Sequence, residues 1–209
     1  MLRALKNKDV INQMIENMKS SIVSGKEQGF NICESREGTV FPAETCKGSS
    51  CYVRFGGKTK QCPDNTDIIG NFHTHPAFYD RRVRYFKNFG RGEIVTQKMS
   101  RPIEDETIMN PVPSPGDLLG LMAKDKLQFT CLGVQTKSNT QMHVGCISKN
   151  RVFNAMREFE PRISINNFSS YERLRNVYES GLFTAVVGKM TDDAEFRNKY
   201  LVMDRFNLR

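Results

Sequence analysis

Two of the three histidines in this chain, His73 and His75, are separated only by Thr74. In an extended strand, side chains two positions apart project from the same face, so both imidazoles can reach one point. Imidazole nitrogen is a preferred ligand of zinc, which takes three protein ligands and a water in catalytic sites. By itself, the pair fits a metal site or two hydrogen-bonded histidines at the end of a strand.

A second polar pattern, Ser114 and Asp117, stands directly before an apolar run that begins at Leu118. This spacing predicts a helix N-terminus in which Ser114 caps backbone amides and Asp117 lies at the positive end of the helix. An aspartate held in the first turn of a helix is also a carboxylate ligand with a defined direction. The pattern therefore indicates a helix cap that is compatible with metal binding.

Several elements must position these side chains. Apolar residues at helical spacing predict an amphipathic helix that ends near Gly25, followed directly by a strand that contains Phe30 and Ile32. Residues 68–72 form a second apolar run, and we expect this strand to stop before Pro76, which cannot donate to a sheet. The histidine pair therefore lies at the end of a buried strand.

The second half of the chain continues with two strand-like runs, 127–136 and 141–148, joined by a polar turn. Beyond residue 150, apolar residues recur at helical spacing. This order of elements predicts a layered, mixed α/β fold. We expect one domain over residues 1–150 and a helical C-terminal extension over residues 151–209.

The composition is that of an ordinary globular protein, which excludes a disordered or collagen-like chain. Of the 209 residues, 38% are hydrophobic and 26% are charged, and the net charge is +8. No apolar run approaches the roughly 18 residues of a membrane span, and residues 1–20 lack the continuous apolar stretch of a signal peptide. We therefore expect a cytoplasmic protein without membrane attachment, whose basic charge suits an acidic partner.

The six cysteines are more typical of thiols or metal ligands than of a disulfide framework in such a chain. Four precede the histidine pair, namely Cys33, Cys46, Cys51 and Cys62. They lack the paired spacing of a zinc ribbon, so thiols, a Cys46–Cys51 disulfide and a second metal site stay open. Cys131 and Cys146 fall on the two arms of the expected hairpin, where we expect small core residues.

Taken together, His-Thr-His-Pro at 73–76 and Ser-Pro-Gly-Asp at 114–117 resemble the JAMM motif of the JAB/MPN metallopeptidases. That motif joins an upstream glutamate, a His-Ser/Thr-His-Pro sequence and a Ser-x-x-Asp sequence, in this order. The resemblance covers residues 8–150. It implies a curved mixed β-sheet flanked by helices, layered as in the cytidine deaminases.

The resemblance also implies the roles of four residues. His73, His75 and Asp117 would bind one zinc ion, with water as the fourth ligand, and Ser114 would hydrogen-bond the developing oxyanion. The family's activity implies hydrolysis of an isopeptide or peptide bond after the C-terminus of ubiquitin or a ubiquitin-like modifier, by a metal-activated water. Two other functions stay open: a non-catalytic MPN assembly or binding module, and a metallohydrolase associated with nucleic acid.

The upstream glutamate of the family serves as general base and lies where the first helix gives way to the first strand. Glu27 occupies that junction and is our choice for this role. Glu34, at the far end of the strand, and Glu44, in an expected turn, are the alternatives.

One departure from the family is the gap of 38 residues between His75 and Ser114, which is longer than usual. We expect an insertion at about residues 77–112. Its segment 81–101 holds seven basic residues and one acidic residue, with aromatic residues interleaved. A lid that clamps an acidic protein, a nucleic-acid grip and a solvated surface loop all fit this composition.

Overall fold

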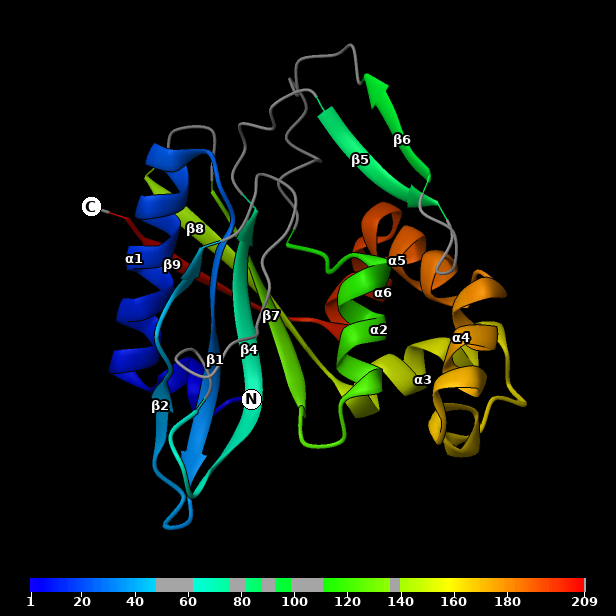
Figure 1. Ribbon diagram of the computed structural model, residues 1–209, viewed down its shortest axis with the longest axis horizontal. Helices are drawn as coiled ribbons and strands as arrows, with labels where there is room; N and C mark the ends of the chain where they lie inside the picture. Colours follow the sequence, from blue (N-terminus) through cyan, green and yellow to red (C-terminus); the bar gives the residue numbers. More distant parts are fainter. Residues whose placement is uncertain (48–61, 76–81, 88–92, 99–110, 136–139, 209) are drawn as a thin grey trace.

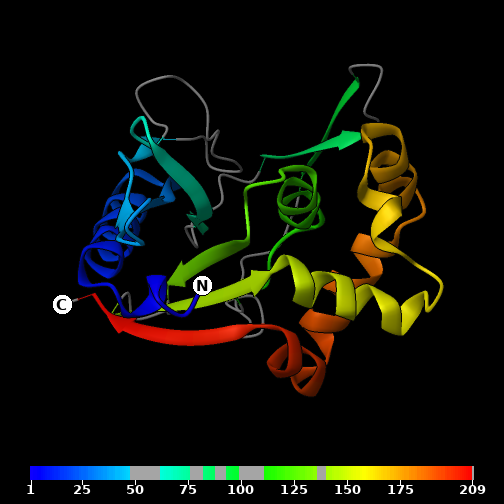
Figure 2. The ribbon, with the colours of Figure 1, turned by 90° about the horizontal axis from the view of Figure 1, so that it is seen from below.

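The computed structural model describes residues 1–47, 62–75, 82–87, 93–98, 111–135 and 140–208. These residues form a curled, mixed β-sheet with α-helices on both sides (Figures 1 and 2). The coarse prediction of a mixed α/β fold is therefore confirmed.

The main sheet of the described residues has the strand order β2-β1-β4-β7-β8-β9, with the short β3 also paired to β1. Its strands are β1 (Gln28–Ser35), β2 (Val40–Pro42), β3 (Cys46–Lys47), β4 (Thr66–His75), β7 (Phe129–Gln135), β8 (Gln141–Ser148) and β9 (Val202–Asn207). Only β4 and β7 run parallel among these pairs. A parallel pair needs a crossover connection, and this one contains helix α2 (Pro115–Ala123). The topology thus carries the chain from the histidines on β4 to Asp117 on α2.

Helix α1 (Lys8–Ser24) has well-defined ends that come from local sequence. The Asn7 side chain caps its start by accepting hydrogen bonds from the amides of Asp9 and Val10. Gly25 ends it with a φ of 63°, a left-handed conformation in which a side chain would be strained. The predicted end of the first helix near Gly25 is confirmed.

Two apolar cores hold the helices to the two faces of the sheet. Helix α1 packs on one face through Met14 and Met18, which lie with Phe30 and Phe72 of β1 and β4 in one cluster. On the other face, α2 packs with the C-terminal helices in a second cluster. Each CH₂ group buried in these clusters stabilises the folded state by about 0.8 kcal/mol. Packing on both faces therefore holds β4 in place.

The C-terminal region differs in part from the predicted helical extension. It contains α3 (Lys149–Phe159), α4 (Tyr171–Glu179), α5 (Leu182–Asp192) and α6 (Ala194–Tyr200). It also contains β9, which returns to the main sheet and pairs antiparallel with β8. No helix of the described ranges is long and apolar enough to cross a membrane.

The insertion predicted at about residues 77–112 is described only in part. Strands β5 (Arg82–Lys87) and β6 (Glu93–Lys98) pair antiparallel in a two-stranded sheet of their own. Figure 1 shows this pair apart from the main sheet, beyond the end of β4. The remainder of the insertion up to residue 110 lies outside the described residues.

The cysteines depart from the predicted thiols and metal ligands. Cys33 of β1 forms a disulfide with Cys62, and Cys131 forms one with Cys146, its partner across β7 and β8. Cys62 is therefore not a ligand of a second metal site. Cys131 and Cys146 are fully buried core residues, as expected, but they are covalently joined. Cys46 is buried, and Cys51 lies outside the described residues.

Candidate metal centre

Three candidate ligands, His73, His75 and Asp117, meet at the end of β4. One ligand atom from each lies within 4.8 Å of the other two, and His73 Nε2 is 3.4 Å from Asp117 Oδ1. Ligands bound about 2.0–2.1 Å from a tetrahedral zinc ion are roughly 3.3–3.4 Å apart. The spacing of this nitrogen and this oxygen therefore matches two corners of a tetrahedral site.

Strand β4 directs both imidazoles to the α2 side of the sheet. His73 lies between two neighbouring strands, opposite Gly29 of β1 and Leu132 of β7, and only 5% of it is exposed. The His75 side chain is at the edge of the site, 23% exposed. Thr74, between them, faces α1 and is fully buried. The site thus has a buried wall at His73 and an opening at His75.

Asp117 divides its two carboxylate oxygens between two tasks. Oδ2 accepts hydrogen bonds from the backbone amide and the hydroxyl of Ser114, both at 2.8 Å. The Ser114 hydroxyl in turn accepts a hydrogen bond from the Asp117 backbone amide, so the two residues form a capping box at the start of α2. This confirms the predicted cap. Because the cap occupies Oδ2, the carboxylate is fixed with Oδ1 towards His73.

The segment that leads into Ser114 crosses β8 at Gly145. A Cβ atom added to Gly145 would overlap the carbonyl oxygen of Pro111. Glycine is therefore required for the backbone of residues 111–113 to lie against the sheet and present Ser114 and Asp117 to β4. Sequence reasoning did not single out Gly145; its signal is a glycine within a predicted strand, which is typical of a close backbone approach.

Replacing Gly145 with alanine should displace this segment. We expect the free energy of unfolding to fall by about 1–3 kcal/mol, as in overpacked cores, and zinc binding to weaken at least several-fold. Denaturant unfolding and competition with a zinc chelator measure the two effects. Gly188→Ala in α5, where nothing lies within 4 Å of the added Cβ, is the control and should bind zinc as the wild type does. Wild-type zinc affinity in Gly145→Ala would contradict this function for the glycine.

Glu27 joins the three ligands from the α1–β1 junction. It lies two residues before Gly29, which pairs with His73, and its Oε1 is 3.6 Å from His75 Nε2. Its side chain is 2% exposed, and Oε2 is buried without a hydrogen-bond partner in the part of the chain described. A buried carboxylate oxygen without a hydrogen bond lowers the stability of the folded protein. Such a group is therefore typical of a site that binds a ligand or takes part in catalysis.

The two alternative glutamates lie away from the histidines. Glu34 pairs with Asp67 near the start of β4, about 20 Å along the strand from His73, and forms an ion pair with Arg3. Glu44 is exposed, between β2 and β3. Of the three glutamates, only Glu27 lies beside His73 and His75. Figure 1 shows the end of β4, the start of α2 and the α1–β1 junction at one end of the sheet.

The electrostatics of the four groups follow from burial and mutual contact. Burial raises the pKa of Glu27 to about 8, with opposing contributions from His73, which lowers it, and Asp117, which raises it. Burial lowers the pKa of His75 to about 4, and His73 adds to this shift. His75 is therefore neutral at pH 7, the form in which imidazole binds metals.

His73 and Asp117 form an ion pair in the metal-free protein. Burial opposes the imidazolium of His73, but the Asp117 carboxylate outweighs it and raises the pKa of His73. Burial also disfavours the ionised carboxylate of Asp117, but its attraction to His73 is the stronger effect. The pKa of Asp117 is therefore well below its usual range. A cation at this site would replace the proton on His73 as the partner of the carboxylate.

The donor set fits a divalent transition metal. Two imidazoles and one carboxylate on three converging side chains leave a position for water, the arrangement typical of catalytic zinc. The unpartnered Oε2 of Glu27 is the polar group that such a water could contact. Residues predicted from sequence for the metal site thus lie together, and Ser114 is joined to them through Asp117.

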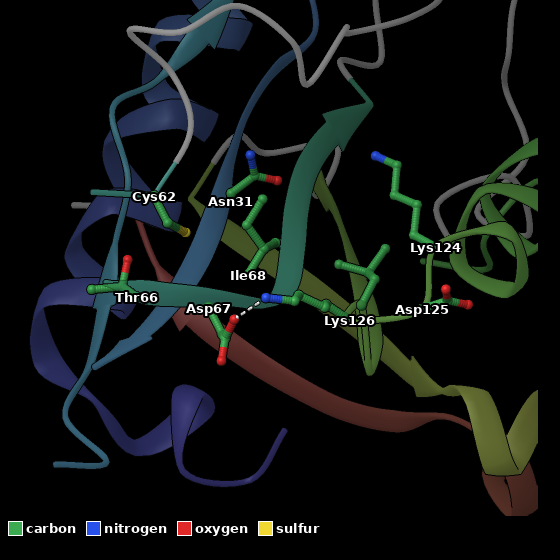
Figure 3. Close-up of a pocket in the computed structure, with 9 residues that line it drawn as sticks. Asn31, Cys62, Thr66, Asp67, Ile68, Lys124, Asp125 and Lys126 are labelled. Carbon is green, nitrogen blue, oxygen red and sulfur yellow. Dashed lines mark hydrogen bonds and ion pairs between the residues drawn. The ribbon is translucent and has the colours of Figure 1, made fainter. Parts of the chain in front are cut away.

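A pocket of about 510 Å³ lies elsewhere, towards the start of β4. Figure 3 shows Asp67 and Lys126 at this pocket, where they form an ion pair of 2.7 Å. Both side chains are largely exposed, and none of the four converging groups lines the pocket. We therefore place the candidate chemistry at the end of β4 and not in this recess.

Comparison of the chain with models of protein families, with curated proteins and with solved structures finds no match in any of the three.

Proposed function

We propose that this chain is a zinc-dependent isopeptidase of the JAMM type. The observation that carries the proposal is the convergence of His73, His75 and Asp117, with the buried carboxyl group of Glu27 3.6 Å from His75. Each of these residues has the position in the motif order that the resemblance requires. A structural ion pair would explain His73 and Asp117 but not the buried Oε2 of Glu27, which has no hydrogen-bond partner among the described residues.

The ligand set supports zinc as the metal. Catalytic zinc takes three protein ligands of nitrogen and oxygen type and keeps a fourth position for water or substrate. When bound, zinc supplies Lewis acidity to the carbonyl oxygen and lowers the pKa of water from 15.7 to about 7. His73, His75 and Asp117 would hold the ion, while the Ser114 cap fixes the direction of the Asp117 carboxylate.

Glu27 is the proposed general base. Its Oε2 is buried without a hydrogen-bond partner among the described residues, so it is available to accept a proton from the attacking water. Burial raises its pKa to about 8 in the metal-free protein. A bound cation would favour the ionised carboxylate, which accepts the proton, while burial keeps the protonated form accessible. Glu27 can therefore hold the proton until the lysine amine leaves and then donate it to that nitrogen.

Ser114 is the proposed donor to the oxyanion. Its hydroxyl is half-buried beside Asp117 and donates to Oδ2 at 2.8 Å. Rotation about the Cβ–Oγ bond would redirect this proton to the developing negative charge while the backbone amide of Ser114 keeps its bond to Oδ2. A single donor of this kind is worth about 3 kcal/mol of transition-state stabilisation.

The substrate class comes from the resemblance: a ubiquitin or ubiquitin-like modifier joined through its C-terminus to a lysine side chain or to a peptide. We retain the cytoplasm as the proposed location. The chain has two disulfides, Cys33–Cys62 and Cys131–Cys146. Because disulfides are rare in the cytosol except in hyperthermophiles, this location implies a hyperthermophilic source.

The decisive experiment uses the whole chain loaded with one equivalent of Zn²⁺. The probe is ubiquitin joined through its terminal glycine to the lysine side chain of a fluorescent peptide, with ubiquitin-like conjugates as further probes. We expect hydrolysis of the isopeptide bond, loss of activity with a chelator and recovery with Zn²⁺. Stoichiometric zinc without cleavage of any of these conjugates or of the corresponding linear fusions would overturn the proposal.

A further inference from the structure

The residue between the two histidines faces away from the candidate metal site and connects to the general base by another route. Thr74 is fully buried on the α1 side of β4. Its Oγ1 accepts a hydrogen bond of 2.9 Å from the backbone amide of Gln28. It also donates to the hydroxyl of Ser21, in the last turns of α1, at 2.8 Å. One hydroxyl thus joins β4, β1 and α1.

Ser21 extends this chain of hydrogen bonds by one step. Its fully buried hydroxyl donates to the backbone carbonyl of Lys26 at 2.7 Å. The two backbone groups that the hydroxyls hold, Lys26 C=O and Gln28 N–H, are the immediate neighbours of Glu27. Both sides of Glu27 are therefore tied to the strand that carries the histidines.

Apart from these bonds, the nearest sheet contact of the Glu27 backbone is the pairing of Gln28 with Lys47 of the short strand β3. Residues 25–27 connect α1 to β1 and belong to neither. Gly25 ends the helix, and the pairing of β1 with β4 begins only at Gly29. The Glu27 side chain must then enter a buried position 3.6 Å from His75. A shift of this junction would carry the carboxyl group away from the ligands while leaving both histidines on β4.

We propose that Thr74 and Ser21 are positioning residues that fix the carboxyl group of Glu27 relative to His73 and His75. This inference depends on the proposed function, because it assigns Glu27 a catalytic position that must be held. Reacting groups displaced by about 1 Å can lose roughly 100-fold in rate. The hydroxyl pair therefore acts on the rate of the chemical step and not on the binding of the metal.

The test compares three variants. Thr74→Val removes the hydroxyl and keeps the shape, Thr74→Ser keeps the hydroxyl, and Thr130→Val is the matched control. Thr130 is a buried threonine on β7 whose hydroxyl donates to Asn71 of β4 at 2.5 Å. Each variant is assayed for zinc affinity, for kcat and KM on the ubiquitin conjugate, and for hydrogen–deuterium exchange at the Gln28 amide.

We expect Thr74→Val to lower kcat by roughly 10- to 100-fold, with KM and zinc affinity close to wild type. Exchange at the Gln28 amide should rise at least tenfold, because its acceptor is gone. Thr74→Ser should restore both values, and Thr130→Val should change neither. Ser21→Ala should change kcat in the same direction by a smaller factor, and it provides the measurement if Thr74→Val does not fold.

Each outcome has a separate meaning. Faster exchange at Gln28 with an unchanged kcat would show that the hydroxyls only satisfy backbone groups, and would overturn the positioning role. Weakened zinc binding in Thr74→Val with an unchanged kcat in the zinc-saturated enzyme would overturn it as well, because the hydroxyl would then act on the ligands. A zinc-loaded wild type that cleaves no conjugate would instead overturn the proposed function, and the positioning role with it.

Discussion

Asp117→Asn should reduce the affinity for zinc by more than roughly 100-fold and abolish activity. Loss of groups that only orient a ligand already costs about 10- to 100-fold in metal affinity, so loss of a ligand should cost more. Asparagine has the size of aspartate, and its oxygen can still accept from the Ser114 amide, as Asp117 Oδ2 does. Its NH₂ group would then face His73, where a donor cannot bind a cation. Zinc content after dialysis and chelator competition measure the effect.

The control for this variant is Asp193→Asn. Asp193 is the N-cap of α6, where it accepts from the Phe196 amide, and its carboxylate forms an ion pair with Lys189. We expect wild-type zinc content and activity from the control. Asp117→Ala should lose zinc as well, together with about 1 kcal/mol of stability from the lost cap. Full zinc content in Asp117→Asn would refute the ligand assignment.

Glu27→Gln should keep zinc and lower kcat by about 10²- to 10⁴-fold, the usual contribution of general acid–base catalysis. Glutamine fills the same buried space but cannot carry the proton. Steady-state kinetics on the ubiquitin conjugate, with zinc content measured on the same sample, give the result. Glu34→Gln is the control, because Glu34 pairs with Asp67 at the other end of the strand and forms an ion pair with Arg3. Wild-type kcat in Glu27→Gln would remove Glu27 from the mechanism.

Without metal, Glu27→Gln should be more stable than the wild type, and the difference should increase as the pH rises. The pKa of Glu27 is raised from 4.5 to about 8 in the folded state. At Glu27, the folded state therefore keeps a proton that the unfolded state loses between about pH 4.5 and pH 8, so the contribution of this residue to stability falls across this range. Glutamine does not titrate, so its advantage should grow with pH, by up to about 1.4 kcal/mol per pH unit within this range. Denaturant unfolding in the presence of a chelator at both ends of the range measures it.

Local signals in the sequence predicted the local parts of the fold. Gly25 ends α1, and the capping box at Ser114 and Asp117 starts α2, because each depends on residues within one helical turn. The histidine spacing also suffices to put two imidazoles on one face of a strand. Such features need no knowledge of the remaining chain.

The identity of the glutamate depended on strand register. Apart from the resemblance, the local sequence does not show which of Glu27 and Glu34, at opposite ends of one strand, lies beside the histidines. The antiparallel register of β1 with β4 decides between them, by setting Gly29 opposite His73 and Glu34 opposite Asp67. The resemblance favoured Glu27 because it occupies the junction of the first helix and the first strand, and the register shows that this end of the strand is the one beside His73.

Long-range pairings escaped prediction from sequence. The disulfide partners Cys33 and Cys62 are 29 residues apart, and cysteine spacing alone does not specify connectivity. Strand β9 is a short edge strand whose Met203, Asp204 and Arg205 are exposed, so no apolar alternation marks it. Both features follow from contacts between distant segments.

The Cys33–Cys62 disulfide also shortens the loop that must close when β1 pairs with β4 during folding. Cys33 pairs with Ile68 across β1 and β4, and along the backbone these residues enclose a loop of about 35 residues. Through the disulfide, Cys62 brings the path to Ile68 down to about six residues. The entropic free-energy cost of closing the shorter loop is smaller by roughly 1–2 kcal/mol, which makes pairing about tenfold more probable. Oxidation therefore makes the β1–β4 contact, on which the alignment of Glu27 with the histidines depends, an early and local event in folding.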